Sequence, residues 1–385
     1  MKTIILITNI LTPYRRYFYD LLYATAKLKG ISFYVLVMTD TSMNGNWHYN
    51  DYKTNYTILM PGKKIRIAKQ IMLFNPRVNK YIENLSPNLI LIAGSYMFPT
   101  NWKVLLKNNN TVPILYWNEA HNNEKREYNK FILKLRNYIR HKFFSHINGY
   151  FYSGKLALDF MKKYSPQGKS YFLPNLIDES KYQAVESISD EEKLKIKEKY
   201  KLDKNKKILI CPARLTYVKG IHTFIDLLNK CHCREKFTLL IPGNGDMEKE
   251  IKKLIKSSQL DIRLLGFKNQ DEMLKLYAIS DIFVLPSLSD PNPLTAIEAL
   301  WCGLPLLVSV HVGNYPEVIK PGINGYVFDY SNENQAISYI DKIVNAPTSW
   351  MKKAKDESLQ IARSIYHSKN VANELINSLY NDFFI

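Results

Sequence analysis

Short apolar runs alternate with helical patterns along the whole chain, and this alternation restricts the fold strongly. The runs predict strands near residues 3–8, 31–38, 88–92, 113–118 and 149–152, and again near 207–211, 237–241, 261–265, 282–285 and 305–309. Strands separated by helices are typical of βαβ units with parallel strands. The sequence therefore predicts an α/β protein with two Rossmann-like, doubly wound domains facing a central cleft, where ligands bind outside the carboxyl ends of the strands.

Two domains also fit the length of 385 residues, because a domain has about 150 residues. The halves are separated by a charged stretch with few large apolar residues, which is typical of a linker. We expect an N-terminal domain over 1–176, a linker over 177–205 and a C-terminal domain over 206–362. A last helix over 363–385 is expected to pack back on the N-terminal domain.

Composition excludes several other classes of protein. Apolar residues make up 46% and charged residues 23%, which excludes a disordered or fibrous chain. No apolar run approaches the roughly 18 residues of a membrane-spanning helix, and the run Ile4–Ile7 predicts a strand that is too short for a signal peptide. The four cysteines are too few for a disulfide framework. These features together predict a cytoplasmic protein.

Positive charge is concentrated in the first half. Residues 1–175 contain 25 basic and 8 acidic residues, a net charge of +17, whereas the rest of the chain contains 28 and 27. Such asymmetry favours an anionic partner for the first half, either phospholipid headgroups or a polyanionic substrate. Solvated lysines alone would also explain it. A nucleic-acid-binding protein is a rival interpretation, but no RRM, KH or helix-turn-helix pattern accompanies the charge.

Two loops of the second half carry cations or glycines after a strand. Arg214 and Lys219 follow the strand near 207–211, where a guanidinium and an ammonium can neutralise a diphosphate. The turn Pro242-Gly243-Asn244-Gly245-Asp246 follows the strand near 237–241. Its glycines allow a tight turn and a close approach of the backbone to a ligand.

Two carboxylates lie around the start of the helix that follows the strand near 282–285. Asp290 precedes this helix and Glu298 lies inside it, so both can face one polyol ligand. Either carboxylate alone would be explained by the helix dipole or by solvation. We expect Asn292 to be the N-cap and Pro293 the first helical residue. The N–H groups then available to a phosphate belong to Leu294 and Thr295.

These motifs, in this order, resemble the retaining glycosyltransferases of the GT-B fold usually numbered family 4. The resemblance covers about residues 206–330. It rests on Arg214 and Lys219, Gly243-Asn244-Gly245-Asp246, Gly266-Phe267, Asp290 with Glu298, Gly303-Leu304-Pro305, Val312-Gly313-Asn314-Tyr315-Pro316-Glu317 and Gly322-Ile323-Asn324-Gly325. It implies transfer of a sugar from a nucleoside-diphosphate sugar, with UDP favoured over GDP, to a saccharide acceptor.

The resemblance also implies roles for individual residues. Arg214 and Lys219 would bind the donor diphosphate, Glu298 the ribose and Asp290 the transferred sugar. The other implied donor-binding residues are Gly243, Gly266, Phe267, Asn292, Leu294 and Thr295. The chain departs from the family where Asp290 replaces the common Glu, and where Pro291-Asn292-Pro293-Leu294 replaces Gly-Phe-Gly-Leu. Pro293 lacks an N–H that could have met the sugar or phosphate.

The first half supplies candidates for the acceptor side. The loop after the first strand contains Thr12, Tyr14, Arg15 and Arg16, and the two adjacent guanidinium groups could hold an acceptor phosphate, although both could equally lie on a helix surface. Family members carry a His or an acidic residue near the anomeric carbon, after the strand near 113–118. Glu119 and His121 are both candidates for this catalytic position, and the sequence does not choose between them.

A basic amphipathic helix is predicted over 124–144. The pattern is typical of a core-packed helix with a basic face or of a membrane-surface helix. We expect a mixture of the two, with the apolar stripe inside the fold and the basic flank turned toward anionic lipid. The stripe consists of Phe131, Leu135, Tyr138, Ile139 and Lys142, and the flank of Lys125, Arg126, Lys130, Lys134, Arg136 and Arg140.

No metal or other cofactor is expected. Cys231-His232-Cys233 has no second ligand pair at zinc spacing, and the chain contains no Asp-x-Asp motif that would suggest a divalent ion. The resemblance implies a role in bacterial surface polysaccharide assembly on a lipid-linked acceptor, at the inner face of the cell membrane. A non-transferring GT-B enzyme, such as a nucleotide-sugar epimerase, is the other enzymatic alternative.

Overall fold

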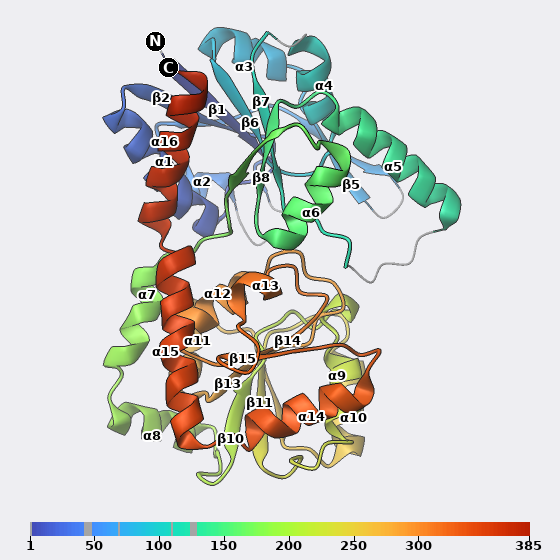
Figure 1. The fold of residues 1–385 in the computed structure, drawn as a ribbon, viewed down its shortest axis with the longest axis vertical. Coiled ribbons are helices and arrows are strands. Elements are labelled where there is room, and N and C mark those ends of the chain that lie inside the picture. The colour runs from blue at the N-terminus through green and yellow to red at the C-terminus, as the bar shows by residue number, and fades with distance from the viewer. Residues whose placement is uncertain (1, 42–47, 68–69, 109–110, 124–128) are drawn as a thin grey trace. The chain divides into compact units, whose positions relative to one another are not determined.

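The computed structural model describes residues 2–41, 48–67, 70–108, 111–123 and 129–385. They form two compact units (Figure 1). Unit 1 contains the chain up to Ala120, the stretch that ends at Leu176, and Ser368–Ile385. Unit 2 contains Ile177–His367 and a short piece that begins at His121.

Unit 1 is built on a parallel sheet of seven strands in the order β3-β2-β1-β6-β7-β8-β9. The strands are β1 (Lys2–Thr8), β2 (Ile31–Val37), β3 (Thr57–Leu59), β6 (Leu89–Ile92), β7 (Ile114–Asn118), β8 (Gly149–Tyr152) and β9 (Lys169–Phe172). An antiparallel hairpin, β4 (Lys63–Ile67) and β5 (Gln70–Phe74), is separate from this sheet. The helices are α1 (Pro13–Leu28), α2 (Tyr49–Tyr52), α3 (Val78–Leu85), α4 (Pro99–Asn108), α5 (Lys130–Phe144), α6 (Lys155–Tyr164) and α16 (Ser368–Phe383).

Unit 2 has a parallel sheet of six strands in the order β12-β11-β10-β13-β14-β15. The strands are β10 (Lys207–Ile210), β11 (Phe237–Pro242), β12 (Ile262–Gly266), β13 (Ile282–Leu285), β14 (Leu306–Ser309) and β15 (Gly325–Phe328). The α-helices are α7 (Glu179–Gln183), α8 (Asp190–Lys199), α9 (Ile221–Leu228), α10 (Glu248–Ser258), α11 (Gln270–Ile279), α12 (Leu294–Trp301), α13 (Tyr315–Val318), α14 (Glu333–Val344) and α15 (Thr348–Ile365). Two 3₁₀ segments are η1 (Ala184–Ser187) and η2 (Tyr217–Lys219).

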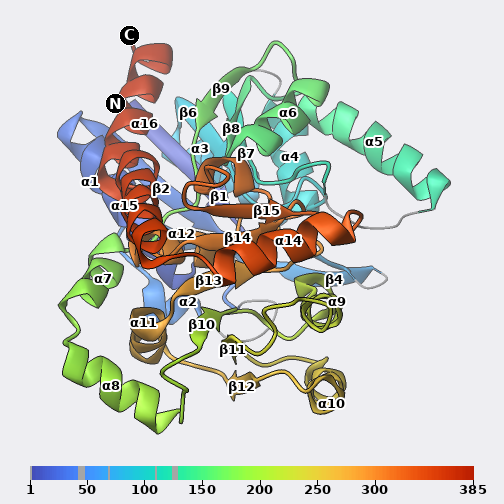
Figure 2. The same cartoon turned by 60° about the horizontal axis from the view of Figure 1, so that its bottom comes forward.

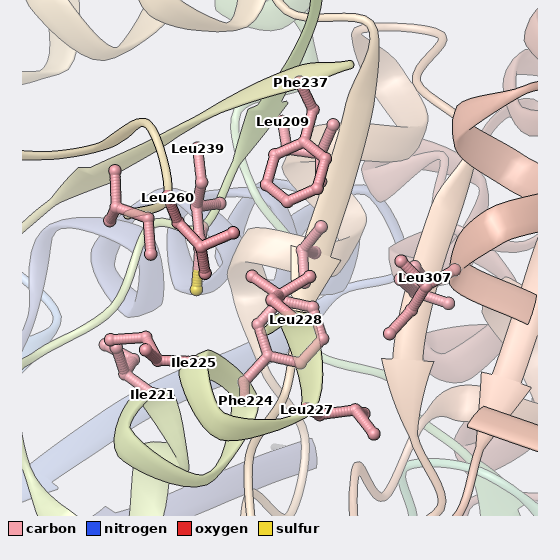
Figure 3. Close-up of a cluster of buried hydrophobic side chains, with 14 of the residues drawn as sticks. Leu209, Ile221, Phe224, Ile225, Leu227, Leu228, Phe237, Leu239, Leu260 and Leu307 are labelled. Atoms are coloured by element: carbon pink, nitrogen blue, oxygen red, sulfur yellow. The ribbon is translucent and has the colours of Figure 1, made fainter. Parts of the chain in front are cut away.

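The central strands read as continuous apolar runs because both faces of each sheet are covered. In unit 2, Leu209 and Leu239 on the strands pack with Phe224 and Leu228 of α9 in one buried cluster (Figure 3). Every residue of β13 is buried, which is the pattern of an inner strand with helices on both sides. This rigid parallel core fixes the loops at the carboxyl ends of the strands.

The stretch 177–205, which the sequence suggested as a linker, groups with unit 2. It contains α7, η1 and α8, and its contacts explain the grouping. The Tyr182 hydroxyl donates a hydrogen bond to Glu298 on α12 at 2.8 Å, and Glu192 forms an ion pair with Lys275 on α11. Buried apolar residues such as Val185 and Ile196 also attach the stretch to the domain.

Helix α16 belongs to unit 1, although all of unit 2 precedes it in sequence. It packs beside α1 (Figures 1 and 2). Lys2 on β1 donates a hydrogen bond to the Tyr380 hydroxyl at 2.8 Å. Asp382 accepts one from the Tyr171 hydroxyl of β9 at 2.5 Å and forms an ion pair with Lys169 at 3.0 Å. These contacts attach α16 to an inner strand, β1, and to the edge strand β9 of the unit 1 sheet.

The expectation that the apolar stripe of the basic helix packs inside the fold is wrong. The described helix is α5, and Glu124 to Tyr128, with Lys125 and Arg126, lie outside the described residues. The side chains of Phe131, Leu135 and Tyr138 are exposed. The helix is attached instead by its C-terminal residues Phe143 and Phe144, which are buried in the unit 1 core.

Candidate functional site

Both sheets have the strand order of doubly wound folds, which bind ligands where the order reverses, outside the carboxyl ends of the strands. The reversal lies between β1 and β6 in unit 1, and between β10 and β13 in unit 2. The loops that follow β1, β10 and β13, together with helices α1 and α12 at their ends, contain most of the residues that the sequence suggested for a site. The two units therefore have one candidate site each.

In unit 2, the loops after β10 and β13 are joined by an ion pair and by backbone hydrogen bonds. Lys219 Nζ lies 2.5 Å from Asp290 Oδ2, and their side chains are only 17% and 11% exposed. The N–H of Leu288 donates to the carbonyl oxygen of Val218 at 2.8 Å. Arg214 is exposed on the same edge of the sheet. The Lys219 ammonium is thus already paired with a carboxylate, whereas the Arg214 guanidinium faces solvent.

The glycine turn after β11 brings its backbone against the loop that carries Arg214. Gly243 has a φ of +142°, and its N–H donates to the carbonyl oxygen of Gly266 at 2.8 Å. A Cβ at this position would lie 2.0 Å from the carbonyl oxygen of Ala213. Only glycine fits here. Phe267, next to Gly266, is 73% exposed and presents its ring to solvent.

The start of α12 differs from the sequence-based prediction. Pro293 is the N-cap, with φ −69° and ψ 127°, and Leu294 is the first helical residue. The proline ring fixes only φ, and this φ is compatible with the extended cap as well as with the first helical turn. Asn292 instead lies in the preceding turn, where it is 7% exposed. Leu294 and Thr295, both partly exposed, still supply the first N–H groups of the helix.

Glu298 is held by two tyrosines that sequence reasoning missed. Its Oε1 accepts a hydrogen bond from the Tyr182 hydroxyl at 2.8 Å, and its Oε2 accepts one from the Tyr277 hydroxyl at 2.7 Å. Burial raises the pKa of the Glu298 carboxyl, while the two hydroxyl donors act in the opposite direction. Tyr182 lies in the supposed linker and Tyr277 on a helix with no motif, so neither carried a recognisable signal.

In unit 1, a cavity of about 480 Å³ lies at the carboxyl ends of β1, β6 and β7. Arg15 and Glu119 form an ion pair in its wall, with 2.5 Å between Arg15 Nη2 and Glu119 Oε1. The guanidinium also lies 4.0 Å from the ring centre of Trp117. Burial alone would lower the pKa of Arg15, but the Glu119 carboxylate keeps it above the ordinary value. Further lining residues are Thr12, Tyr14, Tyr96, Tyr116 and Phe160.

Arg16 does not share this cavity, contrary to the hypothesis of two guanidinium groups on one phosphate. It forms an ion pair with Asp20 at 2.8 Å and donates to the carbonyl oxygen of Tyr52 at 2.9 Å. Arg15 and Arg16 are consecutive residues of α1, and consecutive side chains on a helix do not face the same side. One cation, already paired with Glu119, therefore lines the cavity.

Glu119 and His121 are separated by only one residue but belong to different units. Glu119 lines the unit 1 cavity, whereas His121 is 5% exposed and groups with unit 2. The His121 Nδ1 accepts a hydrogen bond from the N–H of Asn123 at 3.2 Å, which places the proton of a neutral ring on Nε2. In unit 2, a Cβ on Gly313 would lie 2.7 Å from His121 Cδ2.

Within the described part of the chain, no group of three or more His, Cys, Asp or Glu side chains is arranged to hold a metal ion. Cys231 and Cys233 are buried, and His232 lies 2.9 Å from Asp341. The described helices also include none that is long and apolar enough to cross a membrane.

Residues 192–358 match the family model described as Glycosyl transferases group 1. This part of the chain is therefore similar to the group 1 glycosyltransferases. Arg214, Lys219, Asp290 and Glu298 all lie inside the matched range.

Curated relatives match part of the chain. An uncharacterized glycosyltransferase of Methanocaldococcus jannaschii is 31% identical over 196 residues, which are 50% of this chain and 49% of that protein. The amylovoran biosynthesis glycosyltransferase AmsK of Erwinia amylovora is 34% identical over 131 residues, 31% of each chain. The chain thus spans about half the length, or less, of these curated relatives.

The whole fold has solved counterparts. HepE from Anabaena, in complex with UDP and glucose, matches with a TM-score of 0.72 and 15% identity, over 99% of this chain and 100% of that one. The fold of the chain is therefore GT-B, with two Rossmann-like units, as the sequence predicted.

Proposed function

We propose that the protein is a retaining glycosyltransferase that moves a sugar from a nucleoside-diphosphate sugar to a saccharide acceptor. The observation that carries the proposal is the arrangement of Arg214, Lys219 and Asp290 at the strand-order reversal of unit 2, with Glu298 held by its two tyrosines. It brings cations for a diphosphate and carboxylates for sugar hydroxyls to one sheet edge. The HepE structure with UDP and glucose supports UDP over GDP as the nucleotide.

In the proposed reaction, the bond between the anomeric carbon and the diphosphate oxygen breaks, and both bonding electrons leave with the diphosphate. The acceptor hydroxyl forms the new bond on the same face of the sugar and loses its proton to the leaving phosphate oxygen. Arg214, Lys219 and the first N–H groups of α12 stabilise the growing negative charge without a metal. Asp290 orients the transferred sugar and Glu298 the ribose.

The cavity of unit 1 is the proposed acceptor site. Its wall combines aromatic rings, which can cover the apolar face of a sugar, with the Arg15–Glu119 pair, which offers donors and acceptors to hydroxyl groups. The excess of basic residues before Leu176 favours a lipid-linked acceptor and an anionic membrane surface on the cytoplasmic side. The similarity to an amylovoran biosynthesis enzyme supports a role in surface polysaccharide assembly.

A ligand panel tests the donor class. Thermal unfolding is followed with UDP, GDP, ADP, CMP and single-stranded RNA, because a ligand that binds only the folded state raises the midpoint. We expect UDP to give the largest shift. A shift with RNA alone would contradict the proposal and favour the nucleic-acid-binding alternative.

Variants test the site itself. Arg214→Ala and Lys219→Ala should each lower transfer by about 10²-fold, as expected for losing one preorganised charge at a developing anion. The matched control is Lys252→Ala on α10 of the same unit, which removes an exposed lysine paired with Glu248. Nucleotide release that requires an acceptor separates a transferase from an epimerase. Full transfer activity in either site variant would overturn the assignment.

A further inference from the structure

Helix α5 exposes an unusual number of apolar side chains. Of the 14 large apolar side chains that are exposed among the described residues, five lie on this helix. They are Phe131 (74% exposed), Ile132 (46%), Leu133 (40%), Leu135 (48%) and Tyr138 (64%). The N-terminal half of α5 extends beyond the other elements of unit 1 in both views (Figures 1 and 2). Such a concentration marks an interaction surface.

Three of these side chains share one face of the helix. Phe131, Leu135 and Tyr138 have the spacing i, i+4 and i+7, which places them in a single stripe. Phe143 and Phe144, which pack in the core, lie on nearly the opposite side of the helix at about 100° per residue. Ile132 and Leu133 lie on the same side as Phe143 and Phe144 but are exposed, so the core holds only the C-terminal end of α5. The N-terminal half, with the apolar stripe, is left in solvent.

The positive charge of α5 indicates which kind of partner its apolar stripe contacts. From Lys130 to Phe144 the chain has five Lys or Arg residues and no Asp or Glu. Lys130, Lys134 and Lys142 are exposed beside the stripe. Two copies of this helix would bring like charges together, which disfavours self-association. A stripe of apolar residues flanked by exposed cations fits the interface of an anionic membrane, where rings enter the acyl boundary and ammonium groups meet phosphates.

The inner face of α5 connects this surface to the cavity of unit 1. Arg140 Nε donates a hydrogen bond to the Tyr96 hydroxyl at 3.2 Å, and its guanidinium lies 5.0 Å from the ring centre of Phe160. Tyr96 and Phe160 both line the cavity. If a membrane contacts the outer face of α5, only this helix separates it from the proposed acceptor site.

We propose that α5 inserts its Phe131–Leu135–Tyr138 stripe into the interfacial layer of an anionic membrane and thereby holds the unit 1 cavity at the lipid surface. The inference rests on the proposed lipid-linked acceptor and deepens it. The binding is mainly hydrophobic, assisted by charge, whereas a basic surface alone would bind by charge only.

A fluorescent probe distinguishes insertion from surface attraction. The environment-sensitive dye NBD is attached at Phe131→Cys, and at Leu28→Cys as the matched control. Leu28 is 88% exposed and stands between two lysines of the same unit. The four native cysteines are at most 7% exposed, so labelling is confined to the introduced residue. With vesicles of phosphatidylglycerol and phosphatidylcholine, the probe at 131 should shift to the blue while the probe at 28 does not.

Vesicle sedimentation in high salt, with wild-type protein and with substituted variants, completes the test. In 1 M salt the Debye length is about 3 Å, so charge attraction is screened. Wild-type protein should still sediment with anionic vesicles, and Phe131→Ser with Leu135→Ser should lower the bound fraction roughly tenfold. Leu28→Ser should leave it unchanged. Transfer to a water-soluble acceptor should be unaffected in all of these variants, because none of the residues lines the cavity.

Three results would overturn the inference. The first is a blue shift of equal size for the probes at 131 and at 28. The second is a blue shift at 131 that depends on protein concentration without vesicles, which would indicate a second copy of the protein as the partner. The third is sedimentation with vesicles that 1 M salt abolishes. The last result would leave charge-driven docking, and hence the proposed function, intact. Loss of transfer from every nucleotide sugar would instead contradict the proposed function while leaving the insertion result valid.

Discussion

At the scale of single residues, Tyr277 has a specific effect on Glu298. Tyr277→Phe removes a hydroxyl that favours the ionised carboxylate, so the pKa of Glu298, already raised by burial, should rise further. Ribose hydroxyls need a charged acceptor, so the loss of donor affinity on acidification should begin at a higher pH in the variant. We also expect the KM for the donor to rise about tenfold.

The measurement is the pH profile of donor KM for wild type and Tyr277→Phe. Tyr339→Phe is the control, because Tyr339 on α14 stacks on Tyr326 and has no contact with Glu298 among the interactions described. A profile in Tyr277→Phe that coincides with the wild-type profile would show that the hydroxyl only supports the fold.

A variant of the Lys219–Asp290 pair can separate binding of UDP from transfer of the sugar. Asp290→Asn leaves the Lys219 ammonium without its carboxylate in a mostly buried place, which should lower stability by about 3 kcal/mol. UDP supplies a replacement anion, so the midpoint shift caused by UDP should be at least as large as in wild type. Transfer should fall about 10²-fold, because the sugar loses its orienting carboxylate. A UDP shift smaller than in wild type would contradict this role for Lys219.

At the scale of elements, the pairing of β11 with β12 depends on Asp261. Burial acts against its ionisation, but the Arg263, Thr238 and Lys206 side chains donate to it and lower its pKa. A lowered pKa stabilises the fold at neutral pH, and this stabilisation is lost as the pH falls from about 3.8 through the lower folded value.

Asp261→Asn should therefore lower the free energy of unfolding by about 1 kcal/mol at neutral pH and flatten its fall below pH 4. Asp226→Asn, an exposed carboxylate on α9, is the control. Urea unfolding at several pH values measures both effects. The same acid sensitivity in Asp261→Asn as in wild type would assign the effect to other groups.

Most strands of the two sheets were predictable from the sequence, because apolar runs such as Ile208–Ile210 and Ile282–Leu285 are buried on both faces. Short edge strands such as β9 were not predicted from the sequence, because Lys169 and Ser170 are exposed and leave no apolar pattern. The direction of the α5 stripe could not be read either, because periodicity shows that a face is apolar but not what covers it. The two tyrosines that orient Glu298 could not be predicted, because Tyr182 and Tyr277 are distant from it in the sequence.

At the scale of the whole molecule, unit 1 is completed by a segment from the other end of the chain. Removal of 368–385 uncovers the side of α1 that packs on α16 and deletes the partners of Lys2, Thr25 and Tyr171. We expect the truncated protein to lose the calorimetric transition of unit 1, while a transition that UDP stabilises remains for unit 2. If both transitions persist, α16 contributes little to unit 1.

The same connection affects how the protein is made on the ribosome. Domains usually fold in the order of synthesis, but unit 1 waits for α16 while all of Ile177–His367 is translated. This takes roughly 10 to 40 s at about 5 to 20 residues per second. During that interval the side of α1 that packs on α16 is uncovered, whereas unit 2 already has its complete sheet. The earliest segments of the nascent chain are then the ones that need chaperone protection longest. The half with the proposed donor site matures before the half with the proposed acceptor site.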